Sequence, residues 1–282
     1  MRTLRDIIDR IGESQALERP AEVVADSVRP WFEPRGVKNA LSGVWLGHRL
    51  HPLLTDVVIG TWASAGLLDA FRDRDAERSS QRLIGAGLVA SVPTVAAGLS
   101  DYSDLYDHGR RIALVHAVAA DTAVVLQIAS LLARRRGHLG RGRLLSLAAL
   151  GAVGAIGYLG GHLSYVLGVG VDHAAFDEGP KDWEDVGAVA DVTATPTVVD
   201  AAGHEVLLTR IDGQIIGLAN TCSHAGCAIN EGDVADGVIT CPCHGSQFDL
   251  ADGAVVRGPA ASPQLRYDVR EQDGRVLVRG PR

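Results

Sequence analysis

The sequence predicts a multidomain chain, with an N-terminal four-helix transmembrane bundle followed by a small all-β domain. Two observations support this prediction. Four long apolar segments lie between Pro52 and Leu167, and short β-branched runs separated by turn signals dominate from Val192 onward. A chain of 282 residues is long enough for two domains. We expect a polar arm over residues 1–47, the bundle over 48–171, a linker over 172–191 and the β domain over 192–282.

The N-terminal arm is polar and contains three prolines, Pro20, Pro30 and Pro34. Its start, from Leu4 to Ile11, has apolar side chains at helical spacing, which predicts a short amphipathic helix on a surface. No continuous apolar stretch follows the early arginines, so we do not expect a cleavable signal peptide.

Each of the four apolar segments is long enough for a helix to cross a membrane. Each has roughly 20 residues, which is about the length that spans the ~30 Å hydrocarbon core. They run from Pro52 to Phe71, Leu83 to Leu99, Ile112 to Ala133 and Leu144 to Leu167. Helices that are apolar all round are either deeply buried or in a membrane, and this chain is too small to bury four of them in water. We therefore predict four transmembrane helices.

The apolar segments also repeat. His51 and Asp56 head the first segment, and His116 and Asp121 head the third, with the same offset along the chain for both pairs. Gly98-Leu99-Ser100 ends the second segment, and His162-Leu163-Ser164 lies near the end of the fourth at almost the same offset. These matching offsets predict two related helix hairpins with the same orientation in the membrane.

The repeat places His51, His116 and His162 on one side of the predicted membrane, with Asp56 and Asp121 somewhat deeper. Ionisable residues inside a membrane are costly and often mark a functional site. Three interpretations remain open: axial ligands of a b-type haem, a site for another metal or for a quinol (quinone) and its protons, or hydrogen bonds that only fix helix packing.

The β domain is predicted from runs such as Glu205-Val-Leu-Leu and Arg275-Val-Leu-Val. Tight hairpin turns are expected at four Asp-Gly pairs, because this dipeptide favours the backbone angles of such turns. The pairs are Asp212-Gly213, Asp236-Gly237, Asp252-Gly253 and Asp273-Gly274.

All four cysteines lie in two short motifs of this β domain. The motifs are Cys222-Ser-His224-Ala-Gly-Cys227 and Cys241-Pro-Cys243-His244-Gly-Ser246. Two cysteines and two histidines also suit a tetrahedral structural zinc site. However, the single residue between Cys222 and His224 is cramped for two ligands of one ion. It suits two ligands that bind different irons of one cluster, as in a 2Fe-2S centre with two Cys on one iron and two His on the other.

The two motifs resemble those of the Rieske 2Fe-2S family, and within it the high-potential branch found in cytochrome bc complexes. This resemblance covers roughly the C-terminal third of the chain. It implies that Cys222 and Cys241 bind one iron, and that His224 and His244 bind the other.

The resemblance also implies three features around the cluster. Cys227 and Cys243 match the family's disulfide, and Ser246 matches a hydroxyl that donates to a cluster sulfur. Gly258-Pro259 matches the loop that covers the cluster. The chain departs from the family pattern at Phe248, where the bc-type proteins have tyrosine. Without that hydroxyl the reduced state is less stabilised, so we expect a potential below the top of the Rieske range of about −150 to +300 mV.

The stretch from Gly47 to Leu54 is similar to an uncharacterised bacterial family of four-helix membrane proteins that is found joined to Rieske domains. This second resemblance covers the predicted bundle and implies no established chemistry.

Charge is unevenly distributed along the chain. From Lys181 onward there are eight basic and fifteen acidic residues, a net charge of −7, which equals the formal charge of the whole chain. An acidic domain fits docking to a basic protein, and the chain has no basic stripe or phosphate-binding loop. We therefore expect a membrane protein that does not bind nucleic acid.

Arginines set the expected orientation. Nine of them fall in the two short loops on the side opposite the β domain: Arg72, Arg74, Arg78, Arg82, Arg134, Arg135, Arg136, Arg141 and Arg143. The positive-inside rule places these loops in the cytoplasm and the β domain outside. A disulfide agrees with this placement, because such bonds persist in oxidising compartments.

From these features we expect a multi-pass protein of the bacterial cell membrane. The chain would transfer single electrons in an envelope redox chain, with a redox protein or a quinol as partner at the face of His224 and His244. The alternative is a quinol-oxidising subunit with a haem, metal or quinone site in its bundle. A Rieske oxygenase is disfavoured, because the short stretch after His244 leaves no room for a catalytic iron domain.

Overall fold

The computed structural model describes residues 4–280, so the first three residues of the predicted arm and the last two of the predicted β domain lie outside it. It divides the chain into two compact units. The helical unit holds the chain up to Glu33 together with Leu50–Val169. The β unit holds Pro34–Arg49 and the chain from Gly170 onward. The last part of the predicted arm, residues 34–47, therefore belongs with the β unit, as do His48 and Arg49 of the predicted bundle.

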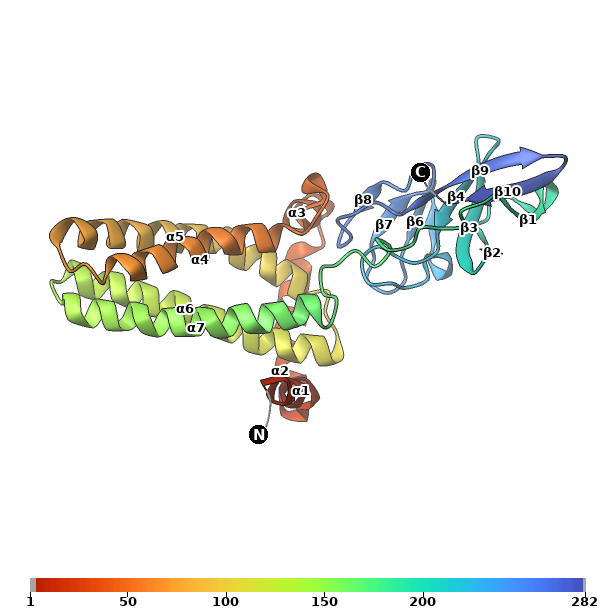
Figure 1. Cartoon of the computed structure of the whole chain (residues 1–282). Coiled ribbons are helices and arrows are strands. Elements are labelled where there is room, and N and C mark those ends of the chain that lie inside the picture. Colours follow the sequence, from red (N-terminus) through yellow and green to blue (C-terminus); the bar gives the residue numbers. More distant parts are fainter. Residues whose placement is uncertain (1–3, 281–282) are drawn as a thin grey trace. The chain divides into compact units, whose positions relative to one another are not determined.

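The helical unit is built on four long helices: α4 (Leu50–Leu68), α5 (Arg74–Tyr102), α6 (Asp107–Arg135) and α7 (Leu139–Tyr165). They run side by side in the left part of Figure 1. Helix α4 packs against α5 and α7, and α6 packs against α7 and α5. Helices α4 and α6 are therefore diagonal partners across the bundle axis.

Among the described residues, three helices are long and apolar enough to cross a membrane, namely α5, α6 and α7. The first predicted span, Pro52 to Phe71, is not among them, although α4 forms there. With 19 residues α4 is about long enough, and it falls short because His51, Thr55 and Asp56 lower its apolar content near its start.

At the end of the bundle opposite His51, buried ion pairs link the helices. The guanidinium of Arg134 donates to Asp69 at 2.5 and 2.8 Å and to Glu77 at 2.9 Å, and Arg143 donates to Glu77 at 3.0 Å. The side chain of Arg134 is fully buried. We call Asp69, Glu77, Arg134 and Arg143 the ionic network. Since burial without partners would be costly, these pairs hold the charges in place.

The N-terminal arm forms helices rather than a solvated segment. Helix α1 (Leu4–Glu13) and helix α2 (Gln15–Phe32) pack on the bundle, α1 against α6 and α2 against α5 and α6. The apolar side of α1 buries Ile8 in a cluster with Tyr102 and Ile112, so the predicted amphipathic helix covers protein surface. Tyr102 donates its hydroxyl to the Ala21 carbonyl at 2.8 Å.

Within the described residues, the β unit has two antiparallel sheets. The larger has the order β1-β10-β9-β4-β3-β2 and the smaller β5-β6-β7-β8. Their strands are β1 (Glu184–Ala188), β2 (Thr197–Ala201), β3 (His204–Ile211), β4 (Gln214–Ala219), β5 (Val234–Ala235), β6 (Val238–Thr240), β7 (Gln247–Asp249), β8 (Val255–Arg257), β9 (Arg266–Gln272) and β10 (Arg275–Arg279). Strand β1 falls inside the predicted linker and pairs with β10.

Three of the four predicted Asp-Gly turns are two-residue hairpins in which both residues have positive φ, as expected for this dipeptide. They join β3 to β4, β5 to β6, and β9 to β10. Around Asp252-Gly253 the connection from β7 to β8 is longer, and only the glycine has positive φ. Local sequence patterns therefore predict most of these hairpins.

Candidate metal centre

The two cysteine motifs form loops with the same backbone pattern. The first follows β4 and the second lies between β6 and β7. In the first, the Cys222 amide donates to the Cys227 carbonyl at 2.7 Å and the Gly226 amide donates to the Cys222 carbonyl at 2.8 Å. In the second, the Cys241 amide donates to the Ser246 carbonyl at 2.8 Å and the Gly245 amide donates to the Cys241 carbonyl at 3.0 Å.

Both glycines have positive φ, +77° at Gly226 and +70° at Gly245, a region that other residues rarely adopt. The motif Cys-x-x-x-Gly occurs in both loops and therefore favours the same backbone conformation in each.

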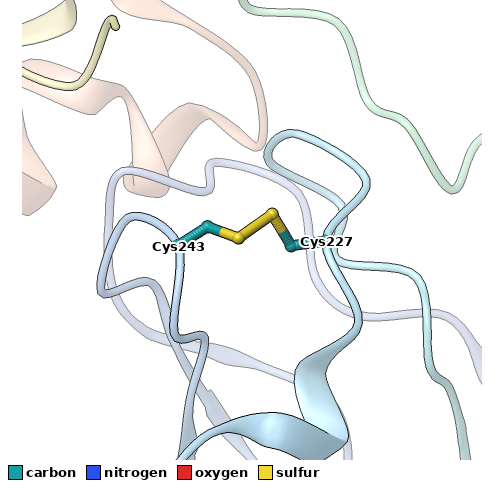
Figure 2. The surroundings of a disulfide bond; sticks show 2 residues. All are labelled: Cys227 and Cys243. Atoms are coloured by element: carbon teal, nitrogen blue, oxygen red, sulfur yellow. A yellow bond between two sulfur atoms is a disulfide. The ribbon is translucent and has the colours of Figure 1, made fainter.

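A disulfide joins the two loops. The sulfurs of Cys227 and Cys243 are bonded at 2.03 Å, and Figure 2 shows the bond bridging the two loops. This pairing was expected from the family resemblance alone, and the structure confirms it.

The other two cysteines are free thiols and both are buried. Cys222 and Cys241 are joined by a hydrogen bond between their side chains. That hydrogen bond raises the pKa of the Cys222 thiol, together with burial, and lowers the pKa of the Cys241 thiol. One of the two sulfurs is thus disposed to be a thiolate, the form that binds metals.

The histidines of the two motifs also meet. The rings of His224 and His244 lie edge to face, with centroids 4.8 Å apart. The Nδ1 atom of His224 is buried, and no atom of the described chain hydrogen-bonds to it. Burial lowers the pKa of both imidazoles, and the positive charge of Arg49 lowers it further. Both histidines are therefore disposed to be neutral, as metal-bound imidazoles are.

A third loop, between β8 and β9, closes over the cysteines. It begins at Gly258-Pro259, which has a cis peptide bond. Ala260 packs in the same core cluster as Cys222 and Cys241, and its amide donates to the Ser246 hydroxyl oxygen at 2.9 Å. Because that oxygen already accepts a bond, the hydroxyl proton of Ser246 remains to be donated elsewhere.

Gln264 ties this third loop to the first one. Its amide nitrogen donates to the carbonyls of Ala219 and Thr221, and its oxygen accepts from the Ser223 amide at 3.1 Å. Phe248 is completely buried in β7, opposite Ile239 and in the same core as the free cysteines.

Sequence reasoning missed a contribution from helix α3 (Arg35–Ser42), which precedes the bundle in the chain. The Asn39 amide nitrogen donates to the Val256 carbonyl at 3.0 Å, and its oxygen accepts from the Gly258 amide at 2.8 Å. Ser42 is fully buried beside Gly258. No local sequence motif predicts these contacts, because Asn39 lies 219 residues from Gly258 in the chain.

The donor set fits a 2Fe-2S cluster. Two buried thiols and two adjacent imidazoles come from loops held in a fixed relation, and a buried imidazole nitrogen is left without a partner in the described chain. The sulfur of Cys241 also lies within 4.8 Å of the sulfurs of Cys227 and Cys243, but those two are joined to each other and cannot supply thiolates. The arrangement can therefore offer two sulfur and two nitrogen ligands to two irons.

Comparison with known families agrees with this geometry. Residues 182–271 match the Rieske [2Fe-2S] domain, and residues 47–173 match a predicted membrane protein family, DUF2231. The β unit thus belongs to the Rieske 2Fe-2S family. The particular chain is a Rieske domain joined to a DUF2231 membrane domain, with a 2Fe-2S cluster as its cofactor.

The chain is similar to an iron-sulfur subunit and to ferredoxins of several enzyme systems. It is 31% identical over 94 residues to a cytochrome b6-f complex iron-sulfur subunit of Chlorobaculum tepidum, covering 33% of this chain and 51% of that protein. It is 31% identical over 98 residues to an anthranilate 1,2-dioxygenase ferredoxin subunit of Burkholderia cepacia, covering 34% and 91%. The ferredoxin of carbazole 1,9a-dioxygenase from Nocardioides aromaticivorans IC177 matches with 28% identity and a TM-score of 0.34, over 36% of this chain and 100% of that one.

The chain thus spans about half the length of the Chlorobaculum subunit. Each of these similarities covers little more than a third of this chain.

The structure does not bring all the residues of the predicted membrane site together. The rings of His51 and His116 lie edge to face, with centroids 6.5 Å apart. Asp56 and Asp121 are exposed, five residues along the same helices. His162 is buried on α7. The two histidines that are equivalent in the repeat come together, and the aspartates do not join them.

Proposed function

We propose that this protein is a membrane-anchored Rieske protein that transfers single electrons in a bacterial envelope redox chain. The observation that carries the proposal is the pair of like-built loops, linked by the Cys227–Cys243 disulfide, that leaves two thiols and two imidazoles adjacent. A 2Fe-2S cluster supplies one-electron chemistry when it is bound, and the chain's residues determine its potential and access.

In this proposal Cys222 and Cys241 hold one iron, and His224 and His244 hold the other. Several contacts support the assignment. The two thiols share a hydrogen bond, and the histidine rings are neighbours on the same two loops. Ser246 would direct its hydroxyl proton toward a cluster sulfur, since its oxygen already accepts from Ala260.

The cluster end of the β unit would be the docking face for the redox partner. His224 and His244 are partly exposed, and Pro242 beside them is exposed. The acidic excess from Lys181 onward favours a partner with basic residues around its own redox group, which would raise the rate of encounter. A quinol bound at the two histidines is the alternative partner at this face.

We place the Rieske domain outside the cytoplasm. Two arguments support this orientation: the arginines concentrated at the opposite end of the helices, and the disulfide, which an oxidising compartment would preserve. Labelling intact cells with a membrane-impermeant reagent at a cysteine introduced at exposed Asp252 tests it. Labelling only after the cells are broken would show that the Rieske domain lies in the cytoplasm.

The function is tested by visible and electron paramagnetic resonance spectra of the detergent-purified full-length protein, oxidised and dithionite-reduced, with iron analysis. We expect the bands of a Rieske cluster and two irons per chain. A colourless protein that contains zinc would refute the proposal.

A further inference from the structure

A second pair of histidines lies in the helical unit, far along the chain from the cysteine motifs. His51 belongs to the first turn of α4 and His116 to α6, and their ring centroids are 6.5 Å apart. Since α4 and α6 are diagonal partners in the bundle, two side chains that meet between them must project toward its axis. Neither residue belongs to the Rieske domain.

The opposite end of the same helices supports this direction. Asp69 follows His51 by the same number of positions as Arg134 follows His116, a spacing of about five full turns of an α-helix. Asp69 therefore lies on the same helix face as His51, and Arg134 on the same face as His116. Asp69 and Arg134 form an ion pair at 2.5 Å. The diagonal helices thus bring equivalent positions together at both ends, about 27 Å apart.

The two ends differ in how their groups are satisfied. At one end a carboxylate meets a guanidinium, so the charges neutralise each other. At the other end two imidazoles meet, and neither supplies a charge that complements the other. Asp56 and Asp121 cannot serve, because five residues turn a helix by about 140° and place them off the axis. Both carboxylates are exposed.

The neighbouring helices make room for the rings and orient them. A Cβ atom at Gly98 on α5 would lie 2.8 Å from Cε1 of His51, and one at Gly160 on α7 would lie 3.3 Å from Cε1 of His116. These contacts pair Gly98 in the first hairpin with Gly160 in the second, two positions before His162. The repeat is one imidazole packed against one glycine, used twice.

The hydrogen bonds leave a nitrogen lone pair on each ring. Nδ1 of His51 lies 3.0 Å from the Thr94 carbonyl oxygen, and because a carbonyl only accepts, Nδ1 carries the proton and Nε2 the lone pair. His116 has a backbone hydrogen bond with Ile156, whereas its buried Nδ1 has no hydrogen-bond partner in residues 4–280. A backbone carbonyl that accepts from one ring nitrogen while the other is left free is the usual environment of a metal-binding histidine.

We propose that His51 and His116 bind one transition-metal ion on the axis of the bundle. Two imidazoles on one ion, at metal–nitrogen distances of about 2.0–2.1 Å, have centroids roughly 5–6.5 Å apart. The observed separation of 6.5 Å lies at the upper end of this range, where the two ligands are on nearly opposite sides of the ion. Imidazole nitrogens suit zinc, copper, nickel and iron. Two protein ligands leave coordination positions open to water or to a small ligand, and helix bundles commonly hold metals in this way.

The proposal is tested by metal binding to full-length protein purified in detergent without a histidine tag. The protein is dialysed against Zn²⁺, and in a separate experiment against Ni²⁺, and bound metal is measured beside the cluster iron. We expect one added ion per chain in the wild type. His51→Gln and His116→Gln should each weaken binding at least tenfold, whereas His138→Gln, at an exposed position near the other end of the bundle, should not.

Two glycine variants test the site without removing either histidine. Gly98→Ala should displace the His51 ring and weaken binding at least tenfold. Gly85→Ala on the same helix should leave binding unchanged, because no described heavy atom lies within 4 Å of its Cβ position. An unaltered Rieske spectrum in every variant separates this site from the cluster, and unaltered helical circular dichroism shows that the bundle has folded.

Three outcomes would overturn the proposal. The wild type could take up no ion, or all variants could bind it equally, which would mark adventitious binding. A Soret band in the purified protein that is lost in His51→Gln would replace the bare ion by a haem.

Discussion

Within residues 4–280, two pairs of histidines have rings that meet edge to face, and the two pairs are built at different scales. His224 and His244 stand on loops of a few residues, whose shape is repeated through Cys-x-x-x-Gly and fixed by a disulfide. His51 and His116 stand at equivalent positions of two helix hairpins, and their rings rest on glycines of neighbouring helices. The first pair is specified by local sequence, whereas the second exists only once four helices have packed.

This difference implies that the two pairs fail in different ways. A change within the loops should affect the cluster and leave the bundle intact. A change within the bundle should affect helix packing, or metal binding, and leave the cluster spectrum intact. Single substitutions in either region can test this separation.

The largest effect is expected from Cys241→Ser. Serine cannot supply the thiolate that we assign to one iron, so iron per chain should fall at least tenfold and the Rieske absorption should disappear. The helical content measured by circular dichroism should stay close to that of the wild type. Full iron content in this variant would exclude Cys241 as a ligand.

Arg134→Met should give the next largest effect, in the bundle. It leaves Asp69 buried without the cation that pairs with it, and Glu77 with Arg143 alone; removing one partner of a buried pair typically costs about 3–5 kcal/mol. Thermal unfolding in detergent, followed by helical circular dichroism, measures the loss. Arg135→Met is the matched control, because Arg135 is exposed. Equal midpoints for the two variants would show that the ionic network has no stabilising role.

Cys243→Ser should destabilise the β unit by about 2–5 kcal/mol, the usual range for loss of a native disulfide. Unlike Cys241→Ser, it should still allow a cluster to form in freshly prepared protein. We expect that cluster to be lost faster on warming, which the decay of the Rieske absorption measures. An unchanged decay rate would show that the loops hold each other without the disulfide.

Asn39→Ala should have a smaller and more local effect. It removes both hydrogen bonds to the strand and loop at Val256 and Gly258, a loss of about 1–3 kcal/mol. Hydrogen exchange in residues 255–262 should become faster, whereas Arg35→Ala, at an exposed position on the same helix, should leave it unchanged. Equal exchange in the two variants would show that α3 does not hold this loop.

The smallest effect is expected from Phe248→Tyr, in which the potential should rise by on the order of tens of millivolts. The reason is that one hydrogen bond contributes about 1 kcal/mol, and about 1.4 kcal/mol corresponds to about 59 mV for one electron. Protein-film voltammetry measures the shift. No rise would mean that the added hydroxyl does not reach the cluster.

The cysteine motifs and hairpins could be predicted because the information lies in adjacent residues. Asp212-Gly213 and Asp273-Gly274 adopt positive φ in two-residue turns, as their side chains favour. The Cys227–Cys243 pairing followed from motif resemblance and is confirmed. In contrast, strand β1 was predicted to be part of a linker, because Pro180 is nearby and few residues around Lys181 are apolar. The strand depends on pairing with β10 rather than on its own propensity.

The sequence by itself determined the Rieske domain, the long apolar helices and the presence of a repeat, because each depends on spacing along the chain. Only the tertiary structure decided which residues of the repeat meet. Predicted together, His51 and Asp56 separate because they lie on different sides of one helix. Asn39 reaches Gly258, and His51 rests on Gly98, because packing brings distant segments together, and no local pattern records such contacts.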